Sequence, residues 1–270
     1  MTSLIAWVAA DSRGPSSLNI ATDSRITWSV DGSLSHYWDR GRKVFASASK
    51  PLIVGYVGDV LFPNLVIPNI LDRIDRSVFR SDGALLDGFT SAVRHEWRGY
   101  PASERRGMSI YLGFRSGVGM SAAFRLRKLV YKSGGSGEWQ TAEIPVPSSP
   151  STWLVIDGSG RSAVEGALKQ WQAGSAANTS RAVFSGFVDA VVSGIDPKSG
   201  GAPQLAGLYR IGTGRLFGIV HQDERYFAGA RLLGDEAVDG IEWRNALFER
   251  TDGRTRLRLP GAQAQARPMN

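Results

Sequence analysis

Two charged side chains interrupt an apolar, strand-like stretch near the start of the chain. The segment "ATDSRIT" carries Asp23 and Arg25 among apolar residues, and "RKVF" carries Lys43 at the start of a further apolar run. A charge inside a strand is costly to bury unless it is paired, so each of these residues needs a partner. Asp23 and Lys43 can neutralise each other, which would bring a carboxylate and an amine together. Each of these residues, taken separately, is also explained if it lies on the exposed face of a strand.

The segment "VIDGSGRSA" has the spacing of a dinucleotide-binding turn. Gly158, Gly160 and Ala163 fit the pattern G-x-G-x-x-A between an expected strand and an expected helix. A dinucleotide-binding domain also needs alternating parallel strands and helices, and an acidic residue about 20 positions further on. The sequence around this turn has neither feature, so we expect no dinucleotide cofactor.

The residue types exclude several other chemistries. The chain has no cysteine, which excludes a thiol nucleophile, a disulfide framework and a cysteine-based zinc site. Its three histidines, His36, His95 and His221, lie far apart and lack the spacing of metal ligands. We also find no G-x-S-x-G nucleophile turn and no P-loop. The sequence therefore predicts neither a metal nor a cofactor.

Strand and helix patterns alternate in blocks along the chain. Residues 3–10 and 18–28 read as a hairpin joined by "DSRGPSS", because glycine and proline favour a turn there. Further strands are expected at 42–47, 52–57, 108–117, 120–132, 152–160, 205–212, 214–221 and 224–232. Helices are expected after Gly58 and at 83–98, 161–173 and 178–194, the last with Asn178 or Thr179 as N-cap. This order favours a layered α+β domain over alternating βαβ units.

Length and charge bound the organisation of the chain. A chain of 270 residues can form one large domain or two. The net charge is +7, and the basic stretch "RTRLRLPGAQAQAR" near the C-terminus could contact nucleic acid or an acidic partner. No nucleic-acid-binding motif accompanies it, so we favour a solvated basic tail and do not expect nucleic acid as a partner. We predict a main domain at 1–235 and a basic extension at 236–270, disordered beyond about Pro260.

The start of the chain bears on its location. Asp11 and Arg13 interrupt the first apolar stretch too early for a secretory signal. No apolar run reaches the roughly 18 residues that a membrane span requires. We therefore expect a cytoplasmic protein without a membrane partner.

Four short motifs occur in an order that resembles one family. These are "ATDSRIT", the Lys-Val pair of "RKVF", "GSG" and "DPKSGG", and together they resemble the proteasome β-subunit family, including its bacterial relatives of the HslV type. The resemblance runs from Thr2 to about residue 230. It implies an N-terminal-nucleophile hydrolase with a four-layer αββα sandwich, in which two antiparallel sheets lie between helix layers. The expected order of strands and helices agrees with that fold.

The resemblance also implies roles for individual residues. It makes Thr2, exposed after removal of Met1, the nucleophile of a threonine-type endopeptidase, and it matches Asp23 and Lys43 to the catalytic acid and lysine. The other implied catalytic residues are Ser159, Asp196 and Ser199, which support the terminal amine, and Gly58, whose N–H forms the oxyanion hole. Implied substrate contacts are Thr27, Phe45 and Tyr56. The expected partners are a peptide or unfolded protein, further copies in a homo-oligomeric ring, and an ATPase unfoldase.

The expected chemistry follows from the ordinary pKa values of the groups. An α-amine titrates near ~7.7–8 and can accept the proton of the threonine hydroxyl, whereas a lysine near ~10.4 stays charged. Lys43 would then favour the alkoxide by its charge, and Asp23 would orient and balance Lys43. Two other functions stay open: an N-terminal-nucleophile amidohydrolase that acts on a small amide, and a catalytically silent ring or nucleic-acid-binding protein.

The sequence departs from the family in length near the site. The opening hairpin and the segment from Asp23 to Lys43 are each a few residues longer than is usual. The insertion "DGSLSHYWDRG" places His36, Tyr37 and Trp38 where a substrate or a ring neighbour could touch them, although packed loop aromatics explain them equally well. We expect this insertion to change the substrate entrance rather than the chemistry.

Overall fold

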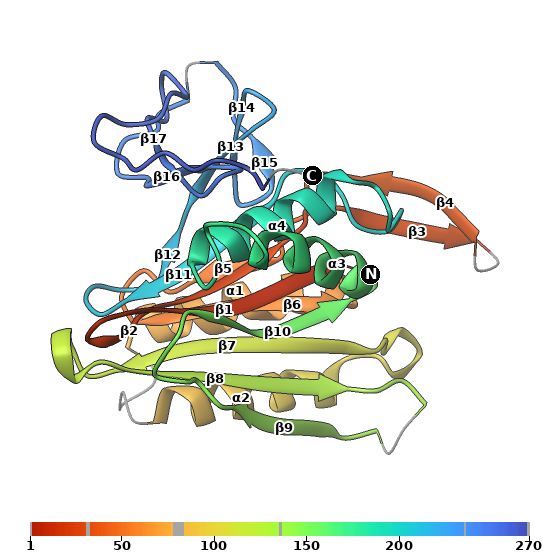
Figure 1. Ribbon diagram of the computed structural model, residues 1–270. Helices are drawn as coiled ribbons and strands as arrows, with labels where there is room; N and C mark the ends of the chain where they lie inside the picture. Colours follow the sequence, from red (N-terminus) through yellow and green to blue (C-terminus); the bar gives the residue numbers. More distant parts are fainter. Residues whose placement is uncertain (1, 31–32, 78–83, 135–136, 235, 269–270) are drawn as a thin grey trace.

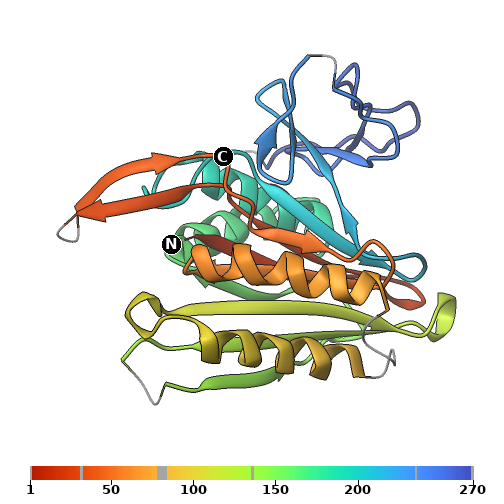
Figure 2. The same cartoon turned by 180° about the vertical axis from the view of Figure 1, so that it is seen from behind.

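The fold stacks two β-sheets between two pairs of helices, as seen in a computed structural model (Figure 1). The structure describes residues 2–30, 33–77, 84–134, 137–234 and 236–268. Figure 2 shows the same layers from behind, with one helix pair in front of the sheets. Among the described residues, no helix is long and apolar enough to cross a membrane.

The first sheet carries the start of the chain in its interior. Its strand order is β10 (Thr152–Gly158), β1 (Ser3–Asp11), β2 (Gly14–Thr22), β11 (Gln204–Tyr209) and β12 (Arg215–Leu216). All neighbouring strands are antiparallel. Ser3 pairs with Gly158, so the first residues of β1 lie beside the end of β10.

The second sheet is antiparallel throughout. Its strand order is β5 (Val44–Ala46), β6 (Leu52–Gly58), β7 (Met108–Ser116), β8 (Ala123–Tyr131) and β9 (Trp139–Ile144). Short 3₁₀ turns at Ala102–Glu104 and Gly119–Ser121 flank β7.

Alternating side chains explain why these sheets lie face to face. In β1, Leu4 and Ala6 belong to a buried cluster shared by the two sheets, whereas Ile5 and Trp7 belong to the cluster under one helix pair. This period of two is what a strand covered on both faces requires. Gly55 in β6 allows the sheets to approach closely, because a Cβ there would meet Ile20.

Each helix pair covers the outer face of one sheet. Helices α1 (Leu61–Asp75) and α2 (Leu85–Gly99) share a buried cluster with the second sheet. Helices α3 (Arg161–Gln172) and α4 (Ser180–Val192) share one with the first sheet. Thr179 caps α4, since its side chain accepts a hydrogen bond from the Ala182 N–H.

Two further units project from the layers (Figure 1). One is the hairpin of β3 (Ile26–Val30) and β4 (Ser33–Trp38). The other is a C-terminal sheet of short strands, in the order β15 (Ala230–Arg231), β14 (Glu224–Phe227), β13 (Gly218–His221), β16 (Trp243–Asn245) and β17 (Arg250–Thr251). Its β13 and β16 are parallel, and its other neighbours are antiparallel.

The structure confirms the α+β prediction, with antiparallel sheets and four described α-helices. A single strand over 18–28 was wrong, because β2 ends at Thr22 and β3 begins at Ile26. The predicted inserted loop forms part of the β3–β4 hairpin, although its residues 31–32 lie outside the described residues.

The predicted domain boundary at residue 235 stays a prediction. The C-terminal sheet takes β13 to β15 from one side of that position and β16 and β17 from the other. The final stretch, predicted to be disordered beyond about Pro260, is described as far as Pro268. There the Arg267 guanidinium forms an ion pair with Asp189 of α4.

Candidate active site

Asp23 is the centre of the candidate site and the reason that β2 ends where it does. Its carboxylate accepts hydrogen bonds from the backbone N–H groups of Ser3, Arg25 and Gly200, each at 3.0 Å. Its oxygen Oδ1 also pairs with the Lys43 amine at 2.9 Å. Because this side chain bonds local and distant backbone groups, the chain leaves the strand after Thr22.

Lys43 brings a cation into the interior beside that carboxylate. Both side chains of the Lys43–Asp23 pair are fully buried. The amine also donates to the Arg25 carbonyl. Burial lowers the pKa of Lys43 below its ordinary value, and the charge of Asp23 opposes that change. The predicted pair therefore forms, and it lies inside the molecule.

Thr2 lies at the same end of β1, next to Ser3. The residue is fully buried, and among the described residues its hydroxyl oxygen Oγ1 has no hydrogen-bond partner. Thr2 lines a small open cavity of about 210 Å³ together with Gly58, Gly158, Ser159 and residues of β7 and β8. Eight buried side-chain atoms lack a hydrogen-bond partner among the described residues, and the Thr2 hydroxyl is the one of them whose residue lines this cavity.

The glycines of "GSG" are explained by close approach to the start of β1. Gly158 has a φ of +99°, and a Cβ there would overlap the Thr2 carbonyl. A Cβ on Gly160 would overlap the Ser3 hydroxyl. Gly58 also has a positive φ, +98°, and its Cβ would meet the Gly107 carbonyl. These positions need glycine because the backbone has no room for a side chain.

A hydroxyl–carboxylate network borders Ser3 and the "GSG" turn. The Ser159 and Ser199 hydroxyls each donate to Asp196 Oδ2 at 2.7 Å. Ser199 Oγ and Ser3 Oγ lie 2.7 Å apart, so the network reaches the residue after Thr2. Gly58 and Ser159 therefore line the cavity with Thr2, Asp196 and Ser199 connect to it through Ser159 and Ser3, and Lys43 connects to it only through Asp23 and Ser3. The seven residues predicted to be catalytic are joined in this way: Thr2, Asp23, Lys43, Gly58, Ser159, Asp196 and Ser199.

The predicted substrate contacts lie elsewhere. Thr27 is in β3, paired with Tyr37 of the projecting hairpin. Phe45 and Tyr56 are buried in the cluster under α1, with ring centroids 6.4 Å apart. Burial raises the pKa of Tyr56, whose hydroxyl donates to the Arg42 carbonyl. None of the three lines the cavity beside Thr2, and their contact with substrate stays a prediction.

Sequence reasoning missed a residue that joins the segments of the site. Gln204, at the start of β11, accepts from the Lys43 N–H at 3.0 Å and donates to the carbonyls of Asp23 at 3.0 Å and Gly41 at 2.7 Å. It is almost fully buried. The signal in the sequence was a polar residue, Gln204, at the start of an apolar strand. Nothing in the sequence spacing connected Gln204 with Lys43.

A second missed pair fixes the segment that follows Asp23. Arg25 and Asp39 form a two-pronged ion pair, with nitrogen–oxygen distances of 2.7 Å and 2.8 Å. Arg25 also donates to the Pro197 carbonyl at 3.1 Å, and its guanidinium carbon lies 3.9 Å from the centre of the Tyr37 ring. This residue therefore ties the "DPKSGG" loop to the base of the hairpin.

The chain is similar to two solved structures at low sequence identity. No family model matches the chain, and no curated protein matches it. Eukaryotic HslV from Trypanosoma brucei is 13% identical, with a TM-score of 0.44 over 76% of this chain and 99% of that one. The Anbu complex from Pseudomonas aeruginosa, described as a helical assembly, is 16% identical, with a TM-score of 0.48 over 87% and 88%. The similarity to these proteasome-like structures is one of fold, at low sequence identity.

Proposed function

We propose that the chain is a threonine-type endopeptidase with the four-layer αββα fold of N-terminal-nucleophile hydrolases. Thr2 attacks the peptide carbonyl after removal of Met1, which lies outside the described residues. The observation that carries this proposal is the Thr2 hydroxyl, which is buried without a partner and lines a cavity with Gly58 and Ser159. A threonine becomes a useful nucleophile when a base stands beside it, and its own α-amine is that base.

The surrounding groups support each step of this proposal. The α-amine of Thr2 takes the hydroxyl proton, and the buried Lys43 charge favours the alkoxide. The Asp23 carboxylate binds both the Lys43 side-chain amine and the backbone N–H of Ser3. It therefore fixes the position of the Lys43 amine relative to the Thr2–Ser3 peptide bond. The Gly58 N–H meets the negative charge that develops on the carbonyl, and loss of such a donor costs about 3 kcal/mol. Ser159, Ser199 and Asp196 support the terminal amine through Ser3.

Three measurements on one protein sample test the proposal. Intact mass shows whether Met1 is removed, a threonine-directed covalent inhibitor adds its mass at Thr2, and fluorogenic peptides report turnover. We expect T2A to lose turnover and labelling, T2S to keep both in part, and the control T141A on β9 to match the unchanged protein. Turnover that survives in T2A would refute the assignment.

The cavity beside Thr2 favours a second candidate, a hydrolase of small amides. Its volume of about 210 Å³ is below the roughly 300 Å³ at which ligand pockets usually begin. In that case small amides would be cleaved through Thr2, and peptides of several residues would not. Comparing a single-residue amide with a longer peptide separates the two substrates, and T2A abolishes both activities if Thr2 is the nucleophile.

We further propose that the peptidase works as an assembly of copies of this chain, with an ATPase unfoldase as a further partner. The assembly is supported by the projecting hairpin, on which the side chains of Trp28, Tyr37 and Trp38 are about half exposed. Large exposed aromatic side chains that gather on one element indicate a protein contact. Sedimentation velocity should show a species larger than the 29.2 kDa chain, and W28S/W38S should shift it toward the monomer.

A further inference from the structure

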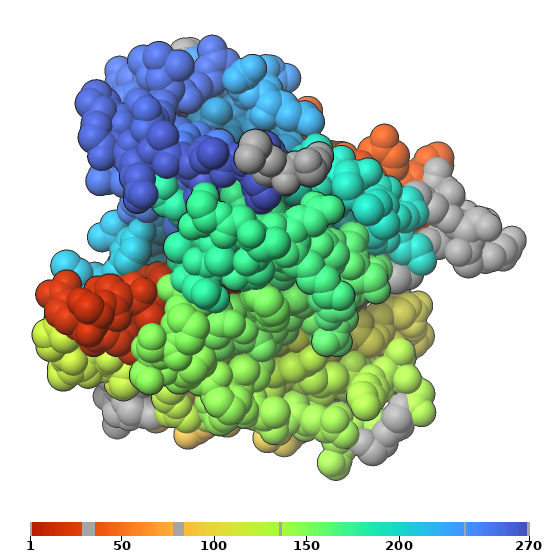
Figure 3. Space-filling model, in the orientation of Figure 1, coloured from red at the N-terminus to blue at the C-terminus, as the bar shows by residue number. Residues whose placement is uncertain are grey.

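A cavity of about 860 Å³ lies at the other end of β1 from Thr2. Its walls are Ala9 and Ala10 at the end of β1, Ser151 before β10, the turn before α4, and residues 259–266 of the C-terminal tail. Figure 3 shows the C-terminal residues, in dark blue, above the green helix layer on this face. From Ser3 to Ala10 an extended strand spans roughly 23 Å, so this cavity is separate from the candidate active site.

The charge of the cavity walls has one sign. Three arginines line it, Arg181, Arg244 and Arg250, and no aspartate or glutamate does. Among the described residues, neither Arg181 nor Arg250 forms an ion pair, although Arg181 donates to the Gln263 carbonyl of the tail at 2.9 Å. Arg244 is paired with Glu242, which is not among the residues that line the cavity. The charges of Arg181 and Arg250 have no such acidic partner among the described residues, and an anion bound in the cavity balances them.

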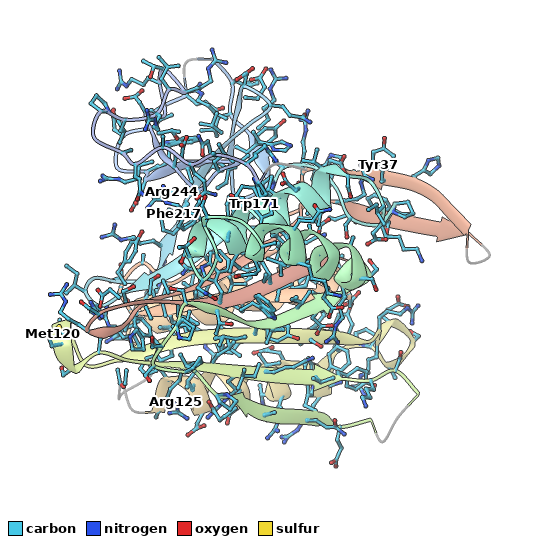
Figure 4. The ribbon with its side chains drawn as sticks, in the orientation of Figure 1. Tyr37, Met120, Arg125, Trp171, Phe217 and Arg244 are labelled. Atoms are coloured by element: carbon cyan, nitrogen blue, oxygen red, sulfur yellow. The ribbon has the colours of Figure 1, made fainter. Side chains whose placement is uncertain are left out.

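Arg244 is the buried member of the three. It is 8% exposed, and its guanidinium carbon lies 5.0 Å from the centre of the Phe248 ring and 5.7 Å from that of Phe217. Its nitrogen Nη2 donates to Glu242 and to the Tyr209 hydroxyl. Figure 4 shows Arg244 beside Phe217, between the C-terminal sheet and the helix layer. The side chain is therefore held in one place by stacking and by hydrogen bonds on one nitrogen.

One donor of Arg244 is left without a partner. Its Nε is buried and, among the described residues, makes no hydrogen bond. A buried donor that lacks an acceptor is costly, and this nitrogen is shielded from solvent, so it is other atoms of Arg244 that line the cavity. The start of α4 lines the same cavity, and a helix N-terminus adds positive potential there. The arginine donors and the helix end favour the same kind of ligand.

We propose that this cavity binds a small phosphate-bearing anion. Arginine forks match phosphate oxygens in geometry as well as in charge, and the Ser180 hydroxyl on the walls, which accepts from the Trp7 indole N–H, adds a further donor. The volume is within the range of roughly 300–1,000 Å³ that is usual for small-molecule sites. Arg181 binds the tail beside the cavity, so the ligand contacts both the body of the protein and residues 259–266 of the tail.

Isothermal titration of the full chain at low ionic strength tests the proposal, with inorganic phosphate, pyrophosphate and ATP as separate probes. We expect one site per chain that weakens as salt is added. R181Q/R250Q removes two of the arginines, of which Arg250 is exposed and Arg181 half-buried, and should weaken binding by about tenfold or more. R244Q, checked for folding by circular dichroism, should weaken it as well.

The control is Arg125 on β8, an exposed arginine paired with Glu143 on the far side of the molecule (Figure 4). R125Q should bind the probes as the unchanged protein does. Tighter binding of ATP than of pyrophosphate identifies a nucleotide as the source of the phosphate, and equal or weaker binding of ATP identifies the free ion. Absence of binding for all three probes, or equal affinity in R181Q/R250Q, would overturn the proposal. None of these readouts depends on peptidase activity.

Discussion

Replacing Lys43 by methionine should destabilise the protein strongly, whatever the protein does. The Lys43 and Asp23 side chains are fully buried, and the amine lies 2.9 Å from the carboxylate. Methionine fills much of the same space, so the main loss is the cation. Removing one partner of a buried ion pair leaves an uncompensated charge and costs about 3–5 kcal/mol. Asp23 keeps three backbone donors, from Ser3, Arg25 and Gly200, which favours the lower end of that range.

The chain offers a matched control for burial. Lys128 lies at the same distance, 2.9 Å, from Asp157, but these side chains are 29% and 26% exposed. K128M should therefore cost no more than about 1 kcal/mol. Urea unfolding followed by tryptophan fluorescence measures both variants, and a loss of about 3 kcal/mol in K43M corresponds to a fall in Tm of roughly 6–12 °C. Equal losses in the two variants would show that burial of the Lys43 pair does not matter and would refute the reasoning.

Three further outcomes follow from other contacts. G158A should lower the stability by at least about 2 kcal/mol, because a Cβ would overlap the Thr2 carbonyl, whereas G166A in α3 meets nothing and should raise it by about 0.5–1 kcal/mol in thermal unfolding. T179A removes the N-cap of α4 and should cost about 1 kcal/mol in urea unfolding, and retention of full stability would contradict that role. Burial lowers the pKa of His221 in the folded protein. Below about pH 6.5 the unfolded chain therefore binds a proton at this histidine more readily than the folded protein does, and the free energy of unfolding falls as pH drops through that range. H221Q should therefore show a smaller drop in Tm between about pH 7.5 and about pH 5.5, and an unchanged drop would contradict the assignment.

The layers of the fold were predictable because their signals are local. An alternating apolar pattern predicted β1, apolar runs that end in glycine turns predicted β6 and β10, and the helical spacing predicted α2 to within two residues at its start. Thr179 was recognised as an N-cap candidate from its residue type and place, and its side chain does cap α4. Such patterns depend only on neighbours in the sequence.

The errors and omissions lie where distant segments meet. Residues 18–28 alternate like one strand, but the Asp23 carboxylate binds the backbone of Ser3 and Gly200, and no local pattern contains that contact. Gln204 was missed for the same reason, since its partners are Lys43, Asp23 and Gly41. The Asp23–Lys43 pair itself was predicted, because burying either charge alone is so unfavourable that the partner could be inferred.

The contacts of Asp23 also determine how much of the chain must be synthesised before the candidate site can form. The carboxylate joins Ser3, Lys43 and Gly200, and the last of these is 177 residues further along the chain. A ribosome-bound chain that ends before Gly200 has the threonine, the acid and the lysine but lacks the donor that completes their arrangement. The order of translation therefore keeps the site incomplete until most of the sandwich has emerged.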